Sequence, residues 1–247
     1  MGPASRASRE VLGVPGPPPA VRRRWLAGSC RKPTRGGRGT ADTGSMIADT
    51  PVLSAQNLTK TYGSTTALDG VSATVRAGES VAVMGASGSG KTTLLHCLAG
   101  IVLPDTGSVR LFGTATGVPA EITSLDDAAR SALRRTEFGF VFQQGLLIPE
   151  LTAGENVALA LMLNGTPRQV AEQQAAAALA ALGLAGMEGR RIGELSGGQA
   201  QRVAIARAQV NGARVLFADE PTGALDSRTS ADVMALLLQS VAGTGRA

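Results

Sequence analysis

The segment "SVAVMGASGSGKTTLLHCLAG", Ser80 to Gly100, decides the fold of this chain. Its centre, Gly85 to Thr92, fits the pattern G-x-x-x-x-G-K-[ST], with an apolar strand before it and a helix of about 91–99 after it. Glycines let a backbone wrap closely around an anion, and the N–H groups at a helix N-terminus favour negative charge. We therefore predict a phosphate-binding loop made of Gly85, Ala86, Ser87, Gly88, Ser89, Gly90, Lys91, Thr92 and Thr93.

A second polar cluster follows an apolar run nearer the C-terminus. "VLFADE", Val215 to Glu220, ends in two acids, and a buried parallel strand delivers its carboxyl end to the ligand side of an open sheet. In phosphoryl transfer, Lys91 would contact the β- and γ-phosphates, while Thr92 and Asp219 would bind Mg²⁺. Glu220 would polarise the attacking water. We expect these residues to meet at one site.

Strand-like and helical segments alternate along the rest of the chain. Strand-like runs occupy 52–62, 71–78, 80–85, 107–113, 138–143 and 214–219, and helical runs occupy 124–135, 153–163, 167–182, 196–209 and 228–241. This alternation predicts an α/β core with a mainly parallel sheet, in which 80–85 and 138–143 are buried strands. Ser124 is the predicted N-cap of its helix, and the helical block at about 145–200 is a predicted inserted subdomain.

Composition and charge exclude several classes of protein. Hydrophobic residues make up 43% of the chain, and no apolar run approaches the roughly 18 residues of a membrane span, so a membrane would be reached only through a partner. Two cysteines, Cys30 and Cys97, form no disulfide framework and fit a reducing cytoplasm. Residues 46–247 carry 15 basic and 17 acidic side chains, which gives no electrostatic case for nucleic acid.

The basic charge belongs to residues 1–45, which carry nine Arg or Lys and two Asp or Glu. This leader is rich in Arg, Gly and Pro and lacks hydrophobic periodicity, so we expect it to be disordered. Two interpretations stay open: a real basic tail, or an upstream mis-start of a protein that begins at Met46. On either interpretation, the folded domain spans 46–247.

The segment "LSGGQAQRVAIARA", Leu195 to Ala208, resembles the signature motif of ATP-binding cassette (ABC) proteins. The resemblance extends from about Val52 to the end of the chain. It implies a P-loop NTPase (RecA-like) core with a small antiparallel β subdomain and an inserted helical subdomain, and ATP and Mg²⁺ as ligands. It also implies a head-to-tail homodimer, in which Ser196, Gly198 and Gln199 of one subunit contact ATP on the phosphate loop of the other.

Three further positions match this family. Tyr62 in "TKTYG" resembles the aromatic residue that stacks on adenine, although an ordinary half-buried strand tyrosine is the alternative. Gln143 resembles the glutamine that senses Mg²⁺ and the attacking water, so the implied catalytic set is Glu220, Gln143 and Lys91. "GALD", Gly223 to Asp226, resembles the D-loop, which usually begins with Ser.

The stretch Leu125–Leu161 is similar to the branch that serves macrolide-export and lipoprotein-release permeases, because an acidic, Arg-rich segment precedes "FGFVFQ". The resemblance implies an ATPase subunit bound to a permease at the cytoplasmic face of the cell membrane. The ATPase of an amino-acid importer is the alternative within transport. A cassette ATPase that acts on ribosomes or DNA is the alternative outside it, and the single phosphate loop and single signature favour transport.

The only histidine in the chain is His96, five positions beyond Lys91. At about 1.5 Å per residue it lies more than a turn from the phosphates, so we expect a packed or partly exposed helix residue rather than a catalyst. The family resemblance implies a further strand after 228–241, ending in a histidine at the γ-phosphate. That strand would begin beyond Ala247, and the expectation is therefore a fragmentary reading frame.

Overall fold

The computed structural model describes residues 27–29, 51–114, 118–143, 145–241 and 246–247. The predicted leader lies outside these residues except for Ala27–Ser29, which form the short strand β1. The question of a start at Met46 also falls outside the described residues. The domain that we predicted at 46–247 therefore begins, as described, with the long strand β2 at Pro51.

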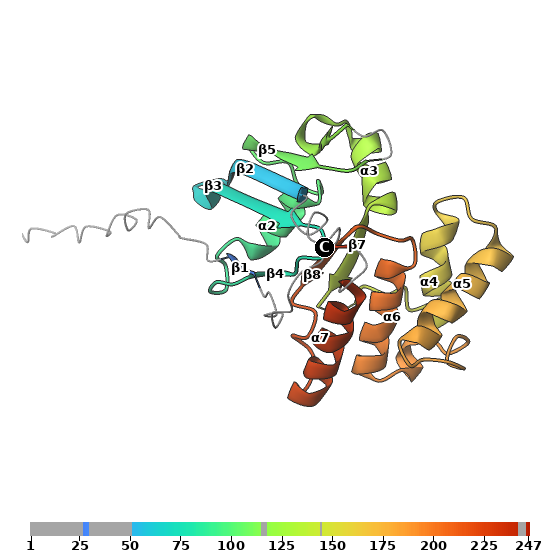
Figure 1. Cartoon of the computed structure of the whole chain (residues 1–247). Helices are drawn as coiled ribbons and strands as arrows, with labels where there is room; N and C mark the ends of the chain where they lie inside the picture. Colours follow the sequence, from blue (N-terminus) through green and yellow to red (C-terminus); the bar gives the residue numbers. More distant parts are fainter. Residues whose placement is uncertain (1–26, 30–50, 115–117, 144, 242–245) are drawn as a thin grey trace, which may run out of the picture.

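An antiparallel sheet of four strands forms one part of the molecule. Its strands lie in the order β3 (Thr65–Arg76), β2 (Pro51–Tyr62), β5 (Thr106–Leu111) and β6 (Ala120–Glu121) (Figure 1). Alternation of apolar residues gives this sheet one buried face, which carries Leu53, Leu58, Leu68, Val109 and Leu111. This confirms the predicted antiparallel β subdomain.

A parallel pair of strands forms the centre of the core. β7 (Phe138–Phe142) and β8 (Val215–Asp219) pair in register from Phe138–Val215 to Phe142–Asp219. Phe138 and Phe217 meet edge to face with ring centroids 5.3 Å apart, a geometry that aromatic rings prefer. Because the strands run in the same direction, their carboxyl ends reach the same edge of the sheet.

The prediction of a mainly parallel sheet with a buried strand at 80–85 is wrong for the residues described. β4 (Val81–Val83) pairs with β1 in antiparallel fashion, and Ala82 is exposed. The edge of β8 away from β7 is paired with Ala247: Leu216 N–H donates to Ala247 O at 2.7 Å, and Ala247 N–H donates to Arg214 O at 2.8 Å. The apolar run at 80–85 therefore predicted a strand, but its burial depends on which neighbours flank it.

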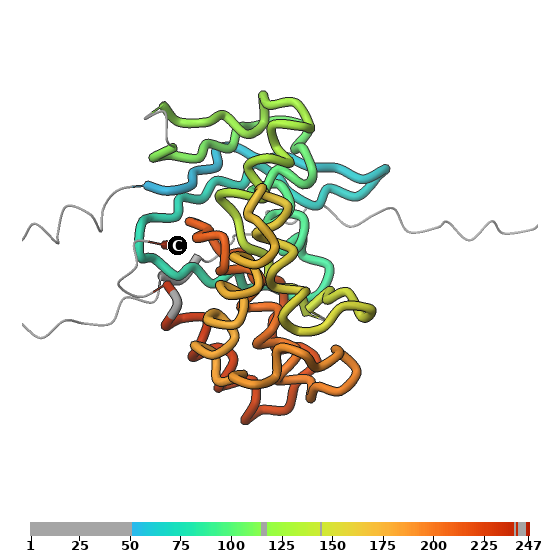
Figure 2. Tube along the Cα trace, turned by 90° about the vertical axis from the view of Figure 1, so that its right-hand side faces the viewer, coloured from blue at the N-terminus to red at the C-terminus, as the bar shows by residue number. Residues whose placement is uncertain are grey.

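The helices α4 to α7 pack against one another. α4 (Ala153–Met162) and α5 (Arg168–Ala181) stand together at the right-hand side of Figure 1, and that side faces the viewer in Figure 2. α6 (Gly197–Gln209) packs against them and also against β7, and α7 (Ser227–Val241) packs against α6. The short 3₁₀ turn η1 (Ile122–Ser124) precedes the helix α3 (Asp127–Thr136), and η2 (Ile192–Glu194) precedes α6. This arrangement places a helical subdomain where the sequence predicted one.

The helix α2 (Lys91–Leu98) follows the glycine-rich loop and packs into the main core. Cys97 is 1% exposed, and burial raises the pKa of its thiol to about 11, so it stays a neutral core residue. His96 is half-buried in the last turn of α2, which agrees with the expectation that it is a packed helix residue.

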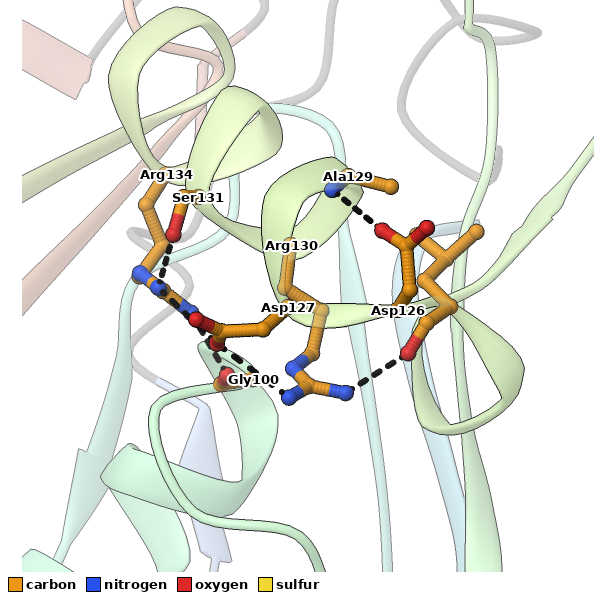
Figure 3. Close-up of polar contacts among 8 residues, drawn as sticks. Gly100, Asp126, Asp127, Ala129, Arg130, Ser131 and Arg134 are labelled. Atoms are coloured by element: carbon orange, nitrogen blue, oxygen red, sulfur yellow. Dashed lines mark hydrogen bonds and ion pairs between the residues drawn. The ribbon is translucent and has the colours of Figure 1, made fainter.

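The helix α3 (Asp127–Thr136) begins at a different residue from the predicted N-cap. Asp126, not Ser124, caps it, because Asp126 Oδ1 accepts from Ala129 N–H at 2.8 Å. Arg134 Nη1 donates to Gly100 O at 2.7 Å, just beyond the end of α2, so the Arg-rich face of α3 is bound to the phosphate-loop helix (Figure 3).

We expect Asp126→Ala to lower the free energy of unfolding by about 1 kcal/mol, because Ala cannot accept the orphan N–H at the start of α3. The midpoint of urea unfolding measures the loss. The matched control is Ser124→Ala, which removes only an exposed hydrogen bond to Glu121 O. If Ser124→Ala proved the more costly change, the assignment of the cap to Asp126 would be wrong.

Candidate nucleotide-binding site

The loop Gly85–Gly90 connects β4 to α2, and its residues up to Gly88 are exposed. Gly90 has a φ of 92°, and a Cβ there would collide with the carbonyl oxygen of Ala67 in β3, so glycine is required. Ser89 is only 7% exposed, yet its Oγ has no hydrogen-bond partner among the described residues. A buried hydroxyl without a partner fits a site that receives polar atoms from a ligand.

Lys91 opens α2 and folds its side chain back over the loop. Its ammonium donates to the carbonyl oxygens of Gly85 and Ala86, each at 3.1 Å. The cation therefore lies at the mouth of the loop, where anionic phosphate oxygens would replace two neutral acceptors. Thr93, the third residue of α2, lies in the same first turn as Lys91.

Thr92 and Asp219 are brought together by the fold although 127 positions separate them. Thr92 Oγ1 donates to Asp219 Oδ2 at 2.9 Å. A hydroxyl and a carboxylate in contact beside a phosphate loop form the oxygen donor set that Mg²⁺ prefers, together with substrate oxygens and water. The residues present therefore fit a magnesium ion.

A cavity of about 330 Å³ opens at this point. Its walls are formed by Thr92, Phe142, Gln143, Leu146, Asp219 and Glu220. Glu220 adopts the left-handed conformation with a φ of 47°, which is uncommon for a residue with a side chain. The hydrogen bond from Gly223 N–H to Glu220 O, at 3.0 Å, closes the turn that holds it there.

The loop that carries Gln143 is held by α6 on both sides. Gln201 Nε2 donates to Phe142 O at 3.1 Å, and Arg207 donates to Gly145 O and Leu146 O, both at 2.7 Å. Burial lowers the pKa of the Arg207 guanidinium. Sequence reasoning missed both residues, because their partners are backbone carbonyls and leave no side-chain pattern.

The predicted signature residues lie at the N-terminus of α6. Ser196 is the N-cap: its Oγ accepts from Gln199 N–H at 3.3 Å, and Gln199 Oε1 accepts from Ser196 N–H at 2.9 Å. This reciprocal capping uses both side chains locally. Gly198 lies between them, and none of the three lines the cavity.

Tyr62 also lies apart from the cavity lining. Its ring is at the end of β2, 50% exposed, with Lys60 Nζ 5.5 Å from the ring centroid. An exposed aromatic face is available for stacking.

In the segment that resembles the D-loop, Asp226 accepts from the N–H groups of Arg228 and Thr229 and from Thr229 Oγ1, and these bonds lower the pKa of its carboxyl.

These features define a P-loop NTPase: a glycine-rich loop between strand and helix, with its Lys, its Thr and the acid at the end of β8 in one place. The sequence profile of the ABC transporter family matches residues 68–223. The chain belongs to this family, as the ATP-binding cassette ATPase domain.

Known proteins with similar sequences point to one branch of the family. The lipoprotein-releasing system ATP-binding protein LolD of Rhodopseudomonas palustris BisB5 is 46% identical over 200 residues, 79% of this chain and 84% of that protein. The pyoverdine export ATP-binding/permease protein PvdT of Pseudomonas fluorescens Pf-5 is 45% identical over 193 residues, 76% of this chain. The match spans only 28% of the length of PvdT.

A solved structure shares the fold. It is a dimeric structure of the ATP-binding cassette MJ0796 in a post-hydrolysis state, bound to ADP and Pi. Its TM-score is 0.69 at 38% identity, covering 78% of this chain and 84% of that one. Among the helices of the described residues, none has the length and apolar character that a membrane crossing needs.

Proposed function

We propose that the chain hydrolyses MgATP as one half of a head-to-tail dimer and drives export through a membrane permease. The contact between Thr92 Oγ1 and Asp219 Oδ2, beside Lys91, carries the proposal, since it places a metal-binding pair at a phosphate loop. The reaction is ATP + H₂O → ADP + phosphate. Catalysis of this reaction depends on positioning and charge neutralisation.

Binding of the triphosphate begins at the loop. The phosphate oxygens would accept from the backbone N–H groups of 86–92 and from Ser89 Oγ, and they would replace the carbonyls that now hold Lys91 Nζ. A charge-assisted bond is stronger than the neutral one that it replaces. Tyr62 would stack on the adenine.

Thr92, Asp219 and Gln143 would hold Mg²⁺. When bound, the ion supplies positive charge that neutralises the phosphates during transfer. The described residues contain no cluster of three or more His, Cys, Asp or Glu side chains, which fits an ion that takes much of its coordination from substrate and water.

Glu220 would accept the proton of the attacking water. Its carboxylate is at the cavity wall, one residue beyond Asp219. Gln143 follows the carboxyl end of the adjacent parallel strand β7 and lines the same cavity, so its amide would orient the same water. Both roles follow from their place around one cavity.

The second half of the site would come from the partner copy. Ser196, Gly198 and Gln199 lie at a helix N-terminus, whose first N–H groups have no partner within the helix and favour anions. They do not line this chain's own cavity, so a second copy is the natural source of this contact. The MJ0796 structure, a dimer bound to ADP and Pi, supports the formation of a dimer.

A permease partner is supported by the relatives, a pyoverdine export ATP-binding/permease protein and the ATP-binding protein of a lipoprotein-releasing system. Such a partner would hold the chain at the cytoplasmic face of the membrane. The test is affinity purification of the full chain from detergent-solubilised membranes of its own source. A stoichiometric multi-span permease, identified by mass spectrometry, is expected. Co-sedimentation with ribosomes instead would contradict a transport role.

The catalytic part has its own test. The purified full chain is titrated with a fluorescent ATP analogue with and without Mg²⁺, and phosphate release is followed with ATP. We expect binding that strengthens with Mg²⁺, and a rise in molar mass by light scattering when ATP is present. A chain that binds no nucleotide under these conditions would refute the proposal.

A further inference from the structure

The end of β2 carries a cation beside an aromatic ring. Lys60 and Tyr62 are two positions apart, so their side chains lie on the same face of the strand. The ammonium of Lys60 lies over the Tyr62 ring, 5.5 Å from the ring centroid, within the roughly 6 Å at which cation–π attraction acts. Lys60 therefore covers one face of the ring, while Tyr62 as a whole remains 50% exposed.

Lys60 is held in this place by Asp105, the residue before β5. Lys60 Nζ donates to Asp105 Oδ1 at 2.8 Å, and the lysine side chain is only 18% exposed. The second carboxylate oxygen, Asp105 Oδ2, accepts from Thr61 N–H at 2.7 Å, and Asp105 N–H donates to Thr59 O at 2.8 Å. Asp105 thus binds three consecutive residues of β2, and the ammonium cannot move away from Tyr62 without breaking its ion pair.

The bonds to Asp105 keep both groups charged. The hydrogen bonds from Lys60 and from Thr61 N–H lower the pKa of the Asp105 carboxyl, and the bond to Asp105 raises the pKa of the Lys60 ammonium. An ion pair that is exposed to this degree contributes little to stability, so its effect on the Tyr62 ring is the larger consequence.

We propose that Lys60 is a positioning residue for the nucleotide base, because it covers one face of the Tyr62 ring and leaves the opposite face for the adenine. This inference rests on the stacking that we propose for Tyr62 in the ATP site. A ring that is already held in place loses less side-chain freedom when a ligand binds. The cation also draws the ring electrons toward itself, which lessens their repulsion of a base stacked on the other face.

The chain offers a selective probe of this ring, since Tyr62 is its only tyrosine. The full chain is labelled with ring-¹³C tyrosine, and NMR then reports one set of ring signals that needs no assignment. We expect MgATP to shift these signals, because a stacked base places the ring within the ring current of the base. Inorganic tripolyphosphate with Mg²⁺ has no base and should leave the signals nearly unchanged.

Lys60→Met removes the cation and keeps a side chain of similar length. The ring signals of the nucleotide-free chain should shift, and the dissociation constant for MgATP should rise roughly two- to fivefold, the effect of an exposed cation–π contact. The dissociation constant for tripolyphosphate should stay unchanged, since the phosphate loop is intact. Asp105→Asn should change the same quantities in the same direction because it releases Lys60. Lys60→Arg should keep the parent values, because a guanidinium can make both contacts.

The matched control is Arg110→Met, which breaks another exposed ion pair of the same sheet, between Arg110 Nε and Glu121 Oε2 at 2.6 Å. It should change neither the ring signals nor either dissociation constant. Melting temperature is measured for every variant, so that a loss of stability is separated from a loss of positioning. A Lys60→Met chain with the ring signals and the MgATP affinity of the parent would overturn the inference. An equal loss of affinity for MgATP and tripolyphosphate would also overturn it, because the base would then play no part.

A double variant tests whether Lys60 acts through the ring. In a Tyr62→Ala background, Lys60→Met should cost no further affinity for MgATP, because the ring that it positions is gone. An equal loss in both backgrounds would mean that the ammonium contacts the nucleotide directly, which contradicts the inference. A parent chain that bound neither MgATP nor tripolyphosphate would refute the proposed function itself. A parent chain that bound MgATP, with Lys60→Met equal to it, would refute the positioning role alone.

Discussion

Replacing Glu220 with glutamine is expected to lower ATP hydrolysis by roughly 10²- to 10⁴-fold, the range that general bases contribute. The amide keeps the size of the carboxylate at the cavity wall but cannot accept a proton from water. Phosphate release at saturating MgATP measures the loss. Because the nucleotide would still bind, the variant should accumulate as an ATP-bound dimer, seen as a doubled molar mass by light scattering.

The matched control for this change is Glu172→Gln. Glu172 is a carboxylate on α5 that pairs with Arg168 at 2.7 Å on the surface, away from the cavity lining. Removing one surface pair costs little, typically under about 1 kcal/mol, so hydrolysis should stay at the parent rate. A Glu220→Gln protein that hydrolysed ATP as fast as this control would refute the role of Glu220.

Replacing Lys91 with alanine should weaken ATP binding by on the order of 100-fold, which corresponds to a lost hydrogen bond to a charged group. In the structure the ammonium already occupies the mouth of the loop through Gly85 O and Ala86 O. Titration with a fluorescent ATP analogue measures the change. A second measurement is the rise in melting temperature that MgATP gives the parent chain by linkage, which should disappear.

Arg168→Ala removes a cation of similar size from the exposed face of α5 and serves as the control for Lys91. It should leave both the affinity for ATP and the thermal shift unchanged. If Lys91→Ala bound ATP as tightly as Arg168→Ala, the loop would not be the phosphate site. The two substitutions at 220 and 91 therefore separate chemistry from binding.

The sequence predicted most of the site because its parts obey local rules. The spacing from Gly85 to Thr92 describes one turn and one helix start, so no distant information was needed. The contact between Thr92 and Asp219 spans 127 positions, and we expected it from the rule that parallel strands end at one edge of a sheet, although β4 pairs with β1 and not with β8. Membership of the ABC transporter family then agreed with the resemblance of the signature segment.

The predictions that were wrong or missing concern features that depend on neighbouring elements of the fold. Ser124 and Asp126 are both good N-cap residues, two positions apart. Ser124 is the last residue of the 3₁₀ turn η1, so Asp126 caps α3 instead. The apolar run at 80–85 gave a strand, but the exposure of Ala82 depends on which strands lie beside β4. Gln201 and Arg207 were missed because a bond to a carbonyl oxygen is independent of the partner's side chain.

One consequence of α6 concerns communication between two nucleotides. Its first residue, Gly197, follows Ser196, and Arg207, about 15 Å further along the helix, holds the loop of Gln143. In the proposed dimer, the N-terminus of α6 would contact the ATP bound to the partner. Arg207, near its C-terminus, contacts the Gln143 loop beside the ATP bound to the same chain. A 13-residue rod of this kind would let each subunit sense across the interface whether the other is loaded, and thereby keep two hydrolysis events in step.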